Sequence, residues 1–240
     1  MIFDNGHTVA PTRSFTESYL HAWLKDVTNM RIAVCLRDIA SHENIPVAES
    51  ILVKNTVPKR QSEFIAGRIC VHILLDKFGV SNQFIGRGPK GEPLLPLGFE
   101  GSISHDGNRA VAALTNQKTI KGIGLDLIDL SRINTDLPLL LIGTDSEITL
   151  VSRYLSKQSV PNIDFKKMGL ILFSLKESAV KVISPNIDHY IDLIDLKLQL
   201  ENQQLFISYK HYPVRLHVFL TISEQEIFTF AIEKREHYLC

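Results

Sequence analysis

The sequence predicts a mixed fold in which a helix followed by an antiparallel meander occurs twice. Long apolar stripes at helical spacing occur near residues 62–78 and 164–183. Each is followed by short apolar runs separated by turn signals, of which Asp106-Gly107-Asn108 is the strongest. No low-complexity tract or long linker separates the two parts. We therefore predict an α/β fold of the α+β kind, with two lobes that each pack a helix on a small antiparallel sheet and a cleft between them.

The elements of the first half follow from periodicity and from helix-ending residues. An amphipathic segment spans residues 15–24, and apolar runs at 32–36 and 51–53 have the length of strands. The main helix covers 62–78 and ends at Gly79. Its core-facing stripe is predicted to comprise Ala66, Ile69, Cys70, Ile73, Leu74 and Phe78.

A loop and three strands come next, followed by the elements of the second half. Five glycines and three prolines make residues 79–100 a shaped loop, and antiparallel strands are predicted at 102–105, 109–114 and 120–130. Thr144 and Glu147 have the spacing of a capping box, which predicts a helix start. Another helix runs over 164–183 and stops before Pro185. Further strands are predicted at 191–200, 205–209, 214–222 and 227–232.

The boundary between the halves is placed at residue 118, which gives an N-terminal half of 1–118 and a C-terminal half of 119–240. No residue-level repeat supports the two-fold organisation, so this division rests on the order of the elements.

Composition excludes several classes of protein. The 26 basic and 26 acidic residues leave no net charge, so we expect no nucleic-acid partner. No apolar stretch approaches the ~20 residues needed to span a bilayer, so no membrane span is expected. The three cysteines, Cys35, Cys70 and Cys240, have no metal-type spacing, which favours a reducing compartment and a cytoplasmic location.

The late helix carries the first candidate site. Glu177 and Lys181 lie one helical turn apart, and Lys176 precedes Glu177. Such a pair is common on solvated helices, where it contributes about 0.2–0.5 kcal/mol and needs no function. The spacing alone therefore allows either a functional site or a solvated surface pair.

Asp126 is the second candidate, because it stands between Leu125 and Leu127 in an apolar strand. Strand alternation could place its carboxylate in solvent. If the carboxylate points inward, it needs a cation or a donor, and Mg²⁺ with a second carboxylate such as Glu177 would satisfy it.

Three further groups could hold phosphates. Ser104 and His105 end a strand beside a turn, where His105 could instead be an exposed turn residue. The segment 86–91 matches a dinucleotide-binding glycine pattern, but Pro89 and later prolines prevent the helix that this motif requires. What remains is a loop presenting Arg87 and Lys90, which suits phosphates or a plain surface turn. The last group is a basic cluster near the start of the first long helix, comprising Lys59, Arg60 and Arg68.

The order of these motifs resembles the 4'-phosphopantetheinyl transferases. Within them it is most similar to the surfactin-type class and the branch that contains the enterobactin synthase transferase component. The matching segments span residues 60–181 and are R60-QSEFIAG-R68, G91-EP, G101-SISH, G122-IGLD and F173-SLKESAVK. Five motifs in this order are highly specific.

The resemblance implies that the α/β fold is a pseudo-dimer of two similar halves, with an active-site cleft between them. Coenzyme A would lie between the halves, with the N-terminal half on the coenzyme A side and the C-terminal half supplying the metal site and the catalytic helix. Asp126 and Glu177 would hold Mg²⁺ with the pyrophosphate of coenzyme A. The phosphate-binding residues would be Ser104, His105, Arg87, Lys90, Lys176 and Lys181, with Arg60 and Arg68 near the 3'-phosphate.

The implied activity is transfer of phosphopantetheine to a serine of an apo acyl or peptidyl carrier protein, as in siderophore or other nonribosomal peptide or polyketide synthesis. Glu177 would act as the base, while His105 and Lys181 would neutralise charge that develops at the phosphate. Because two halves complete the site within one chain, a monomer is expected.

One position departs from the family pattern. Many relatives have a glutamate two residues after the metal-binding aspartate, where this chain has Ile128. Alternation places Ile128 on the same side as Asp126 and Asp129 on the other, so water would replace one ligand and Mn²⁺ could be preferred. We predict that activity survives. Two alternatives are a catalytically impaired binder of coenzyme A or carrier protein, and a metal-dependent phosphohydrolase of nucleotides or coenzyme A.

Overall fold

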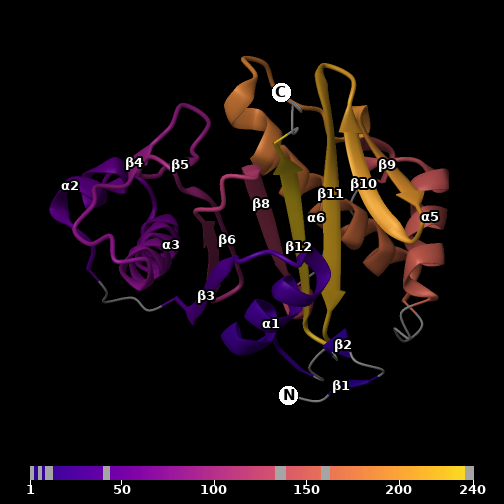
Figure 1. Cartoon of the computed structure of the whole chain (residues 1–240), viewed down its shortest axis with the longest axis horizontal. Coiled ribbons are helices and arrows are strands. Elements are labelled where there is room, and N and C mark those ends of the chain that lie inside the picture. Colours follow the sequence, from indigo (N-terminus) through magenta and orange to yellow (C-terminus); the bar gives the residue numbers. More distant parts are fainter. Residues whose placement is uncertain are drawn as a thin grey trace.

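The computed structural model describes residues 3–4, 7–8, 13–39, 44–132, 139–157 and 163–235. Cys240 lies outside this part of the chain. Two main sheets dominate the fold (Figure 1), and two strand pairs complete the sheet structure of the described residues. No helix in the described ranges is both long and apolar enough to cross a membrane.

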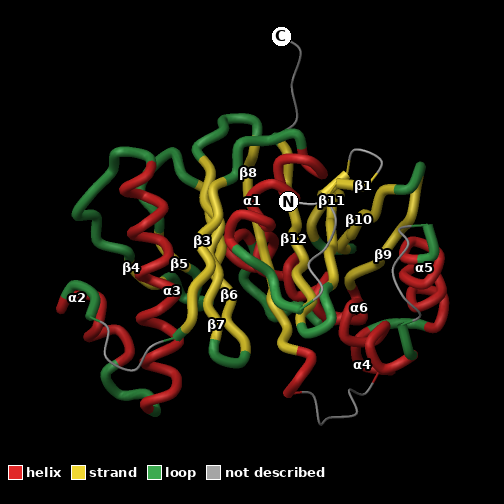
Figure 2. Tube along the Cα trace, turned by 90° about the horizontal axis from the view of Figure 1, so that it is seen from below, coloured by secondary structure: helices red, strands yellow, loops and turns green. Residues whose placement is uncertain are grey.

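The first half contains a three-stranded antiparallel sheet with the order β3-β7-β6. The long helix α3 packs on one face of this sheet (Figure 2). The elements of this half are β1 (Phe3–Asp4), β2 (His7–Thr8), α1 (Glu17–Thr28), β3 (Ala33–Asp38), α2 (Val47–Ser50), the 3₁₀ helix Ile51–Val53, α3 (Pro58–Lys77), β4 (Gly86–Arg87), β5 (Pro93–Leu94), β6 (Glu100–Asp106) and β7 (Arg109–Thr115).

The second half contains a five-stranded antiparallel sheet with the order β8-β12-β11-β10-β9. The long helix α6 crosses one face of it. The elements are β8 (Ile120–Asp129), α4 (Leu139–Ile142), α5 (Asp145–Leu155), α6 (Phe165–Ile183), β9 (Leu196–Glu201), β10 (Gln204–Tyr209), β11 (Tyr212–Ile222) and β12 (Glu226–Lys234), with 3₁₀ turns at Leu130–Arg132, Ser184–Asn186 and Leu193–Asp195. Each half thus has the predicted organisation of a long helix on an antiparallel sheet.

Local sequence explains where the long helices begin and end. Pro58 occupies the first turn of α3, where its missing N–H costs no hydrogen bond, and Gly79 follows the helix with φ +76°. The Asp164 carboxylate caps α6 by accepting from the Lys167 N–H. The capping box predicted at Thr144 and Glu147 is present at the start of α5.

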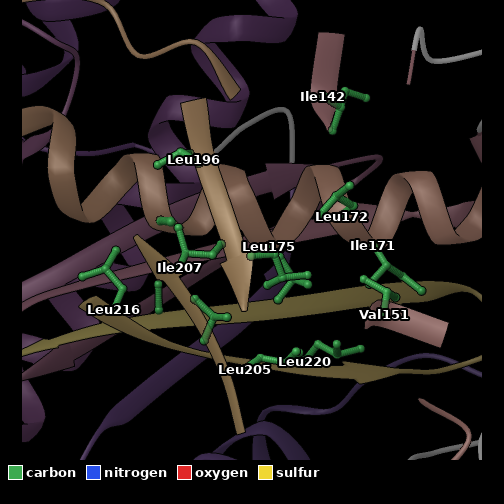
Figure 3. Packing of buried hydrophobic residues seen from close by; sticks show 14 of the residues in the cluster. Ile142, Val151, Ile171, Leu172, Leu175, Leu196, Leu205, Ile207, Leu216 and Leu220 are labelled. Atoms are coloured by element: carbon green, nitrogen blue, oxygen red, sulfur yellow. The ribbon is translucent and has the colours of Figure 1, made fainter. Parts of the chain in front are cut away.

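Three hydrophobic clusters hold these layers together. The largest joins α5 and α6 to the five-stranded sheet (Figure 3), and the labelled side chains include Leu172, Leu175, Ile207 and Leu216. The second lies under α1 and includes residues of both sheets, while the third joins α3 to the three-stranded sheet. Alternation along β12 allows this arrangement, because Ile227 faces the first cluster and the adjacent Phe228 faces the second.

Two predicted elements are corrected by the structure. Residues 51–53 form a 3₁₀ turn rather than a strand, because the chain continues in right-handed helical geometry from Ser50, and only Val53 of the three is buried. The strand predicted at 191–200 begins only at Leu196, because Leu193–Asp195 form a 3₁₀ turn. The strand predicted at 120–130 is β8, and it belongs to the second sheet. Its hydrogen-bonding edge pairs with β12 along its whole length, from Asp129 opposite Glu226 to Ile120 opposite Lys234. In addition, Ile73 of the predicted core stripe is 37% exposed.

The two sheets meet where β6 lies beside β8 without pairing with it (Figure 1). The chain passes from one sheet to the other between Thr115 and Ile120, around the boundary placed at residue 118. Because the cluster under α1 contains residues from both sides of this boundary, the division into two domains stays a prediction.

Candidate functional site

A cavity of about 1030 Å³ lies between the two halves. Its walls come from α3, the 87–95 loop and β6 on one side, and from β8 and α6 on the other. All but one of the predicted site residues line it, namely Arg60, Arg68, Arg87, Lys90, Ser104, His105, Asp126, Glu177 and Lys181. The exception is Lys176.

Asp126 points into the structure, which decides between the two orientations that alternation left open. Its side chain is 11% exposed and lies on the α6 side of β8. Ser104 donates to Oδ1 at 2.9 Å, and Ser174 of α6 donates to Oδ2 at 2.9 Å. Hydroxyl donors on both oxygens fix the orientation of the carboxylate.

The close approach of α6 to β8 depends on Gly124. A Cβ at this position would lie 2.0 Å from the Ser178 carbonyl oxygen, so a larger residue would push the helix away. This approach places Ser174, Glu177 and Lys181 of α6 beside Asp126. The segment G122-IGLD therefore supplies the Asp126 carboxylate and, through Gly124, the space that allows α6 to approach it.

Glu177 and Lys181 form part of the cavity wall rather than a solvated surface pair. The Lys181 ammonium donates to Asp126 Oδ1 at 3.0 Å, to Ser104 Oγ at 3.0 Å and to the Leu125 carbonyl at 2.7 Å. Burial raises the pKa of the Glu177 carboxyl; the Lys181 charge opposes this rise and the Asp126 charge adds to it. Glu177 is thus close enough to Asp126 to feel its charge, in a site where water is partly excluded.

Lys176 is placed elsewhere, so its predicted contact with a phosphate is corrected. Its side chain is fully buried, and its ammonium lies 2.9 Å from Glu147 Oε1 and 2.8 Å from the Ile142 carbonyl. Burial lowers the pKa of Lys176. Adjacent residues on a helix point about 100° apart, so Lys176 faces the α5 side while Glu177 faces the cavity. Lys176 anchors α6 to the start of α5.

Arg60 and His105 meet at the α3 side of the cavity. The Arg60 guanidinium donates to His105 Nε2 at 2.5 Å, and Glu63 lies 3.5 Å from both Arg60 NH1 and His105 Nδ1. Burial lowers the pKa of His105; the Glu63 charge opposes this fall, and the Arg60 and Lys181 charges add to it. Sequence reasoning did not select Glu63, although its i,i+3 spacing from Arg60 is visible in the sequence.

Arg68 lines the cavity, but its guanidinium is already bound within the protein. It is 2% exposed, donates to the Gly86 carbonyl at 2.8 Å and lies over the Phe64 ring. Its Nε atom lies 4.0 Å from the fully buried Glu49 carboxylate. Burial lowers the pKa of Arg68 to about 10. Arg68 therefore positions the strand that carries Arg87.

Glu49 was also missed by the sequence analysis. Its carboxylate accepts from the Ile85 N–H at 2.9 Å and lies 3.0 Å from His72 Nε2, so it joins α2, α3 and the loop before β4. Further along this loop, Lys90 donates to the His189 carbonyl at 2.8 Å. This bond connects the two halves across the rim of the cavity, and nothing in the sequence pairs two residues so far apart.

Ile128 lines the cavity on the side of β8 that carries Asp126, as alternation predicted. It is 8% exposed and also packs into the core beneath α6. The Asp129 carboxylate instead accepts from Ser131 at 2.6 Å and lies against Gly107. Asp129 is not among the cavity-lining residues. The cavity wall next to Asp126 is therefore apolar at Ile128.

The donor set suits a cation that brings its own remaining ligands. Within the described residues, no group of three or more His, Cys, Asp or Glu side chains could hold a metal. Asp126 and Glu177 supply two carboxylates at one cavity, and the repulsion between them would be relieved by a cation. Mg²⁺ commonly uses one or two carboxylates together with water and substrate phosphates. The residues present therefore fit Mg²⁺ or Mn²⁺ bound jointly with a phosphate ligand.

Comparison with known proteins found similarity to 4'-phosphopantetheinyl transferases. Residues 48–115 match the family model of the 4'-phosphopantetheinyl transferase N-terminal domain. The chain is 37% identical to the 4'-phosphopantetheinyl transferase PptT of Mycobacterium tuberculosis over 78 residues, which cover 32% of this chain and 34% of that protein. It is 33% identical to enterobactin synthase component D of Salmonella typhi over 129 residues, covering 54% and 50%.

A solved structure also overlaps with part of the chain. The holo-(acyl-carrier-protein) synthase from Bacillus anthracis, in complex with CoA, superposes with a TM-score of 0.38 at 18% identity, covering 49% of this chain and 98% of that one. The chain spans about a third to a half of the length of the two curated relatives described above. The sequence matches confirm the resemblance carried by the motifs: this chain is similar to the 4'-phosphopantetheinyl transferases of the enterobactin synthase component D and surfactin type.

Proposed function

We propose that this protein transfers the 4'-phosphopantetheine group of coenzyme A to a serine of an acyl or peptidyl carrier protein. The observation that carries the proposal is the convergence of Asp126, Glu177 and Lys181 at one cavity between the halves. Buried carboxylates beside an ammonium and basic loops suit a pyrophosphate substrate with a divalent cation.

Coenzyme A would occupy the cavity, with residues 1–118 forming its binding side. The volume of about 1030 Å³ is large enough for an extended cofactor. Because Arg60 contacts His105, these two side chains would hold the same phosphate. Arg87 and Lys90 lie in the loop that lines the cavity on the same side, and they supply further positive charge. Arg68 acts indirectly by positioning this loop.

The C-terminal half would supply the metal site and the base. Asp126 and Glu177 would hold Mg²⁺, which neutralises charge on the pyrophosphate when it is bound. Ser104 and Ser174 keep the Asp126 carboxylate in place. Lys181 reaches the same carboxylate oxygen and would remain near the developing charge.

The reaction requires deprotonation of a serine hydroxyl, which is a weak nucleophile at neutral pH. Glu177 would take this proton as the serine oxygen forms a bond to the β-phosphorus of coenzyme A. The bond from that phosphorus to the bridging oxygen breaks, and 3',5'-adenosine bisphosphate leaves with the electron pair. Glu177 lines the cavity, so its carboxylate can meet a serine hydroxyl that enters there. No covalent enzyme intermediate is needed.

Because Ile128 offers no ligand atom, water would complete the shell of a cation held by Asp126 and Glu177, and we expect activity to survive with Mg²⁺ or Mn²⁺. Since one chain provides both walls of the cavity, a monomer is sufficient. Carrier domains of siderophore, nonribosomal peptide or polyketide synthesis are the expected partners, and the cytoplasm is the expected location.

Mass spectrometry tests the proposal directly. The protein is incubated with coenzyme A, Mg²⁺ and an apo carrier domain, and the carrier is expected to gain one phosphopantetheine group. Loss of coenzyme A in the absence of carrier would indicate a phosphohydrolase. Unchanged masses for both substrates, across a panel of carriers, would indicate a binding protein without turnover.

A further inference from the structure

Glu63 lies behind the phosphate-binding pair, at a position for which the proposed mechanism has no role. Its side chain is 14% exposed on α3, and one carboxylate oxygen, Oε2, lies 3.5 Å from both Arg60 NH1 and His105 Nδ1. All three residues line the cavity. A carboxylate beside an anion-binding site is unfavourable for the anion unless it contributes through another group.

The contacts of His105 determine which ring nitrogen carries its proton. A guanidinium N–H can only donate, so the contact from Arg60 NH1 makes Nε2 of His105 an acceptor. The proton of the neutral ring then lies on Nδ1, which is the nitrogen that faces Glu63. A carboxylate at this position also stabilises the imidazolium form, in which both nitrogens donate.

We propose that Glu63 is a positioning residue that holds His105 with its proton on Nδ1 and allows His105 to become imidazolium when a phosphate binds at Nε2. The inference rests on the proposed function only for the identity of that phosphate, which would belong to coenzyme A. On binding, the phosphate replaces the ring as an acceptor for Arg60. Nε2 takes up one proton from solvent, and the resulting N–H donates a hydrogen bond to the phosphate oxygen.

The surrounding charges make Glu63 the main group that favours this proton uptake. Arg60 on α3 and Lys181 on α6 disfavour the charged ring, and burial acts in the same direction. Asp106, the neighbour of His105 on β6, favours it to a smaller extent than Glu63. Removing the Glu63 charge should therefore leave His105 neutral when the phosphate binds.

Two variants separate the charge of Glu63 from its hydrogen-bond acceptor. Glu63→Gln keeps an acceptor oxygen without the charge, and Glu63→Leu removes both. Glu201→Gln is a matched control, because Glu201 also pairs with an arginine, Arg215, but lies on an exposed strand away from the cavity. Thermal unfolding of each variant confirms that it is folded.

The first measurement uses the free protein and does not depend on coenzyme A. Nitrogen-15 spectra of the histidine rings, with His105 assigned through His105→Gln, report which nitrogen is protonated. We expect the Nδ1-protonated form in the wild type and in Glu63→Gln. In Glu63→Leu the Arg60 contact still favours that form, but Nδ1 has lost its acceptor, so we expect a mixture of the Nδ1- and Nε2-protonated forms. An unchanged ring in Glu63→Leu would overturn the positioning role.

The second measurement follows proton uptake when coenzyme A binds. Calorimetry near pH 7.5 in two buffers of different ionisation enthalpy should detect uptake by the wild type and Glu201→Gln, and a reduced uptake by Glu63→Gln. The Kd and the KM for coenzyme A should rise roughly 3- to 10-fold in Glu63→Gln while kcat changes by less than about twofold. Equal proton uptake in Glu63→Gln and wild type would contradict the inference. A wild type that binds no coenzyme A would overturn the proposed function and the identity of the phosphate, while the ring spectra would still decide the role of Glu63.

Discussion

The ammonium group of Lys181 lies 3.0 Å from Oδ1 of Asp126, and the hydroxyl of Ser104 donates to the same carboxylate oxygen at 2.9 Å. Lys181 also donates to Ser104 Oγ. Residues from β6, β8 and α6 are thus joined by one network at the wall of the cavity. In this arrangement the lysine balances the charge of the carboxylate that would hold a divalent cation.

Replacing Lys181 with methionine should therefore reduce activity without unfolding the protein. We expect kcat/KM for carrier modification to fall about 10²- to 10³-fold, the range for the loss of one donor to a developing charge. Because Asp126 loses its cation, added Mg²⁺ should raise the Tm of Lys181→Met more than that of the wild type. Lys210→Met, at an exposed pair with Asp195, is the control. Wild-type turnover in Lys181→Met would rule out the assigned role.

Glu177→Gln should stabilise the metal-free protein while abolishing transfer. Burial raises the pKa of Glu177 in the fold. For an acid with a raised pKa, the folded state binds more protons than the unfolded state, so this group's contribution to stability is lost as pH rises through the folded pKa. At pH 7.5 the ionised carboxylate is therefore unfavourable, and removing its charge should raise Tm in the presence of chelator. Chemical denaturation at pH 5 and pH 7.5 compares the unfolding free energy of the variant with that of the wild type. The variant should be more stable at pH 7.5, and the difference should shrink at pH 5. Equal unfolding free energies at pH 7.5 would contradict the stated environment of Glu177.

Ile128→Glu should increase metal affinity at a cost in stability. The side chain lines the cavity next to Asp126 but also packs into the α6 core. A glutamate there adds a third carboxylate, so the metal-free variant should have a lower Tm than the wild type. Added Mg²⁺ should raise the Tm of the variant more than that of the wild type. Transfer assays with Mg²⁺ and Mn²⁺ provide the second readout. A wild type inert with both metals beside an active Ile128→Glu would refute the expectation that the natural site works.

Lys176→Met should act on stability rather than on chemistry. The change leaves the Glu147 carboxylate buried without its cation, which costs about 3–5 kcal/mol of unfolding free energy. Adding Glu147→Gln should recover part of this loss, because the amide can still accept from the Leu198 N–H. Urea unfolding and kcat/KM corrected for the folded fraction separate the two effects. If the single variant unfolds like the wild type but loses turnover, Lys176 belongs to the reaction site after all.

Local patterns in the sequence predicted most of the fold. Helix caps and turn residues act over a few positions, so the starts of α5 and α6 and the β6-β7 turn could be located from them. Strand pairing depends on residues far apart in the sequence, so the partner of β8 could not be predicted. Its partner β12 begins about a hundred residues later, and the register there is set by packing on both faces of the sheet.

The site residues divide in the same way. Motif order identified Asp126, Glu177 and Lys181, and the structure brings them together. Lys176 has the same charge as Lys181 and lies in the same motif, but the direction of a side chain from a helix depends on which neighbours are buried. Glu49 could not be found because a carboxylate that pairs with a distant histidine has no local signature. The spacing of Glu63 from Arg60 is a local signature, but its contact with His105 is not visible in the sequence.

The most direct test of the account is to measure Mn²⁺ binding in the presence of 3',5'-adenosine bisphosphate. The wild type, Asp126→Asn and Glu177→Gln are compared by the electron paramagnetic resonance signal of free Mn²⁺, with Glu201→Gln as the control. If Asp126 and Glu177 share one cation, the wild type and the control should each bind one Mn²⁺ per chain, which Mg²⁺ displaces, and each carboxylate variant should bind it far more weakly. Equal binding by the wild type and both carboxylate variants would contradict the shared metal site.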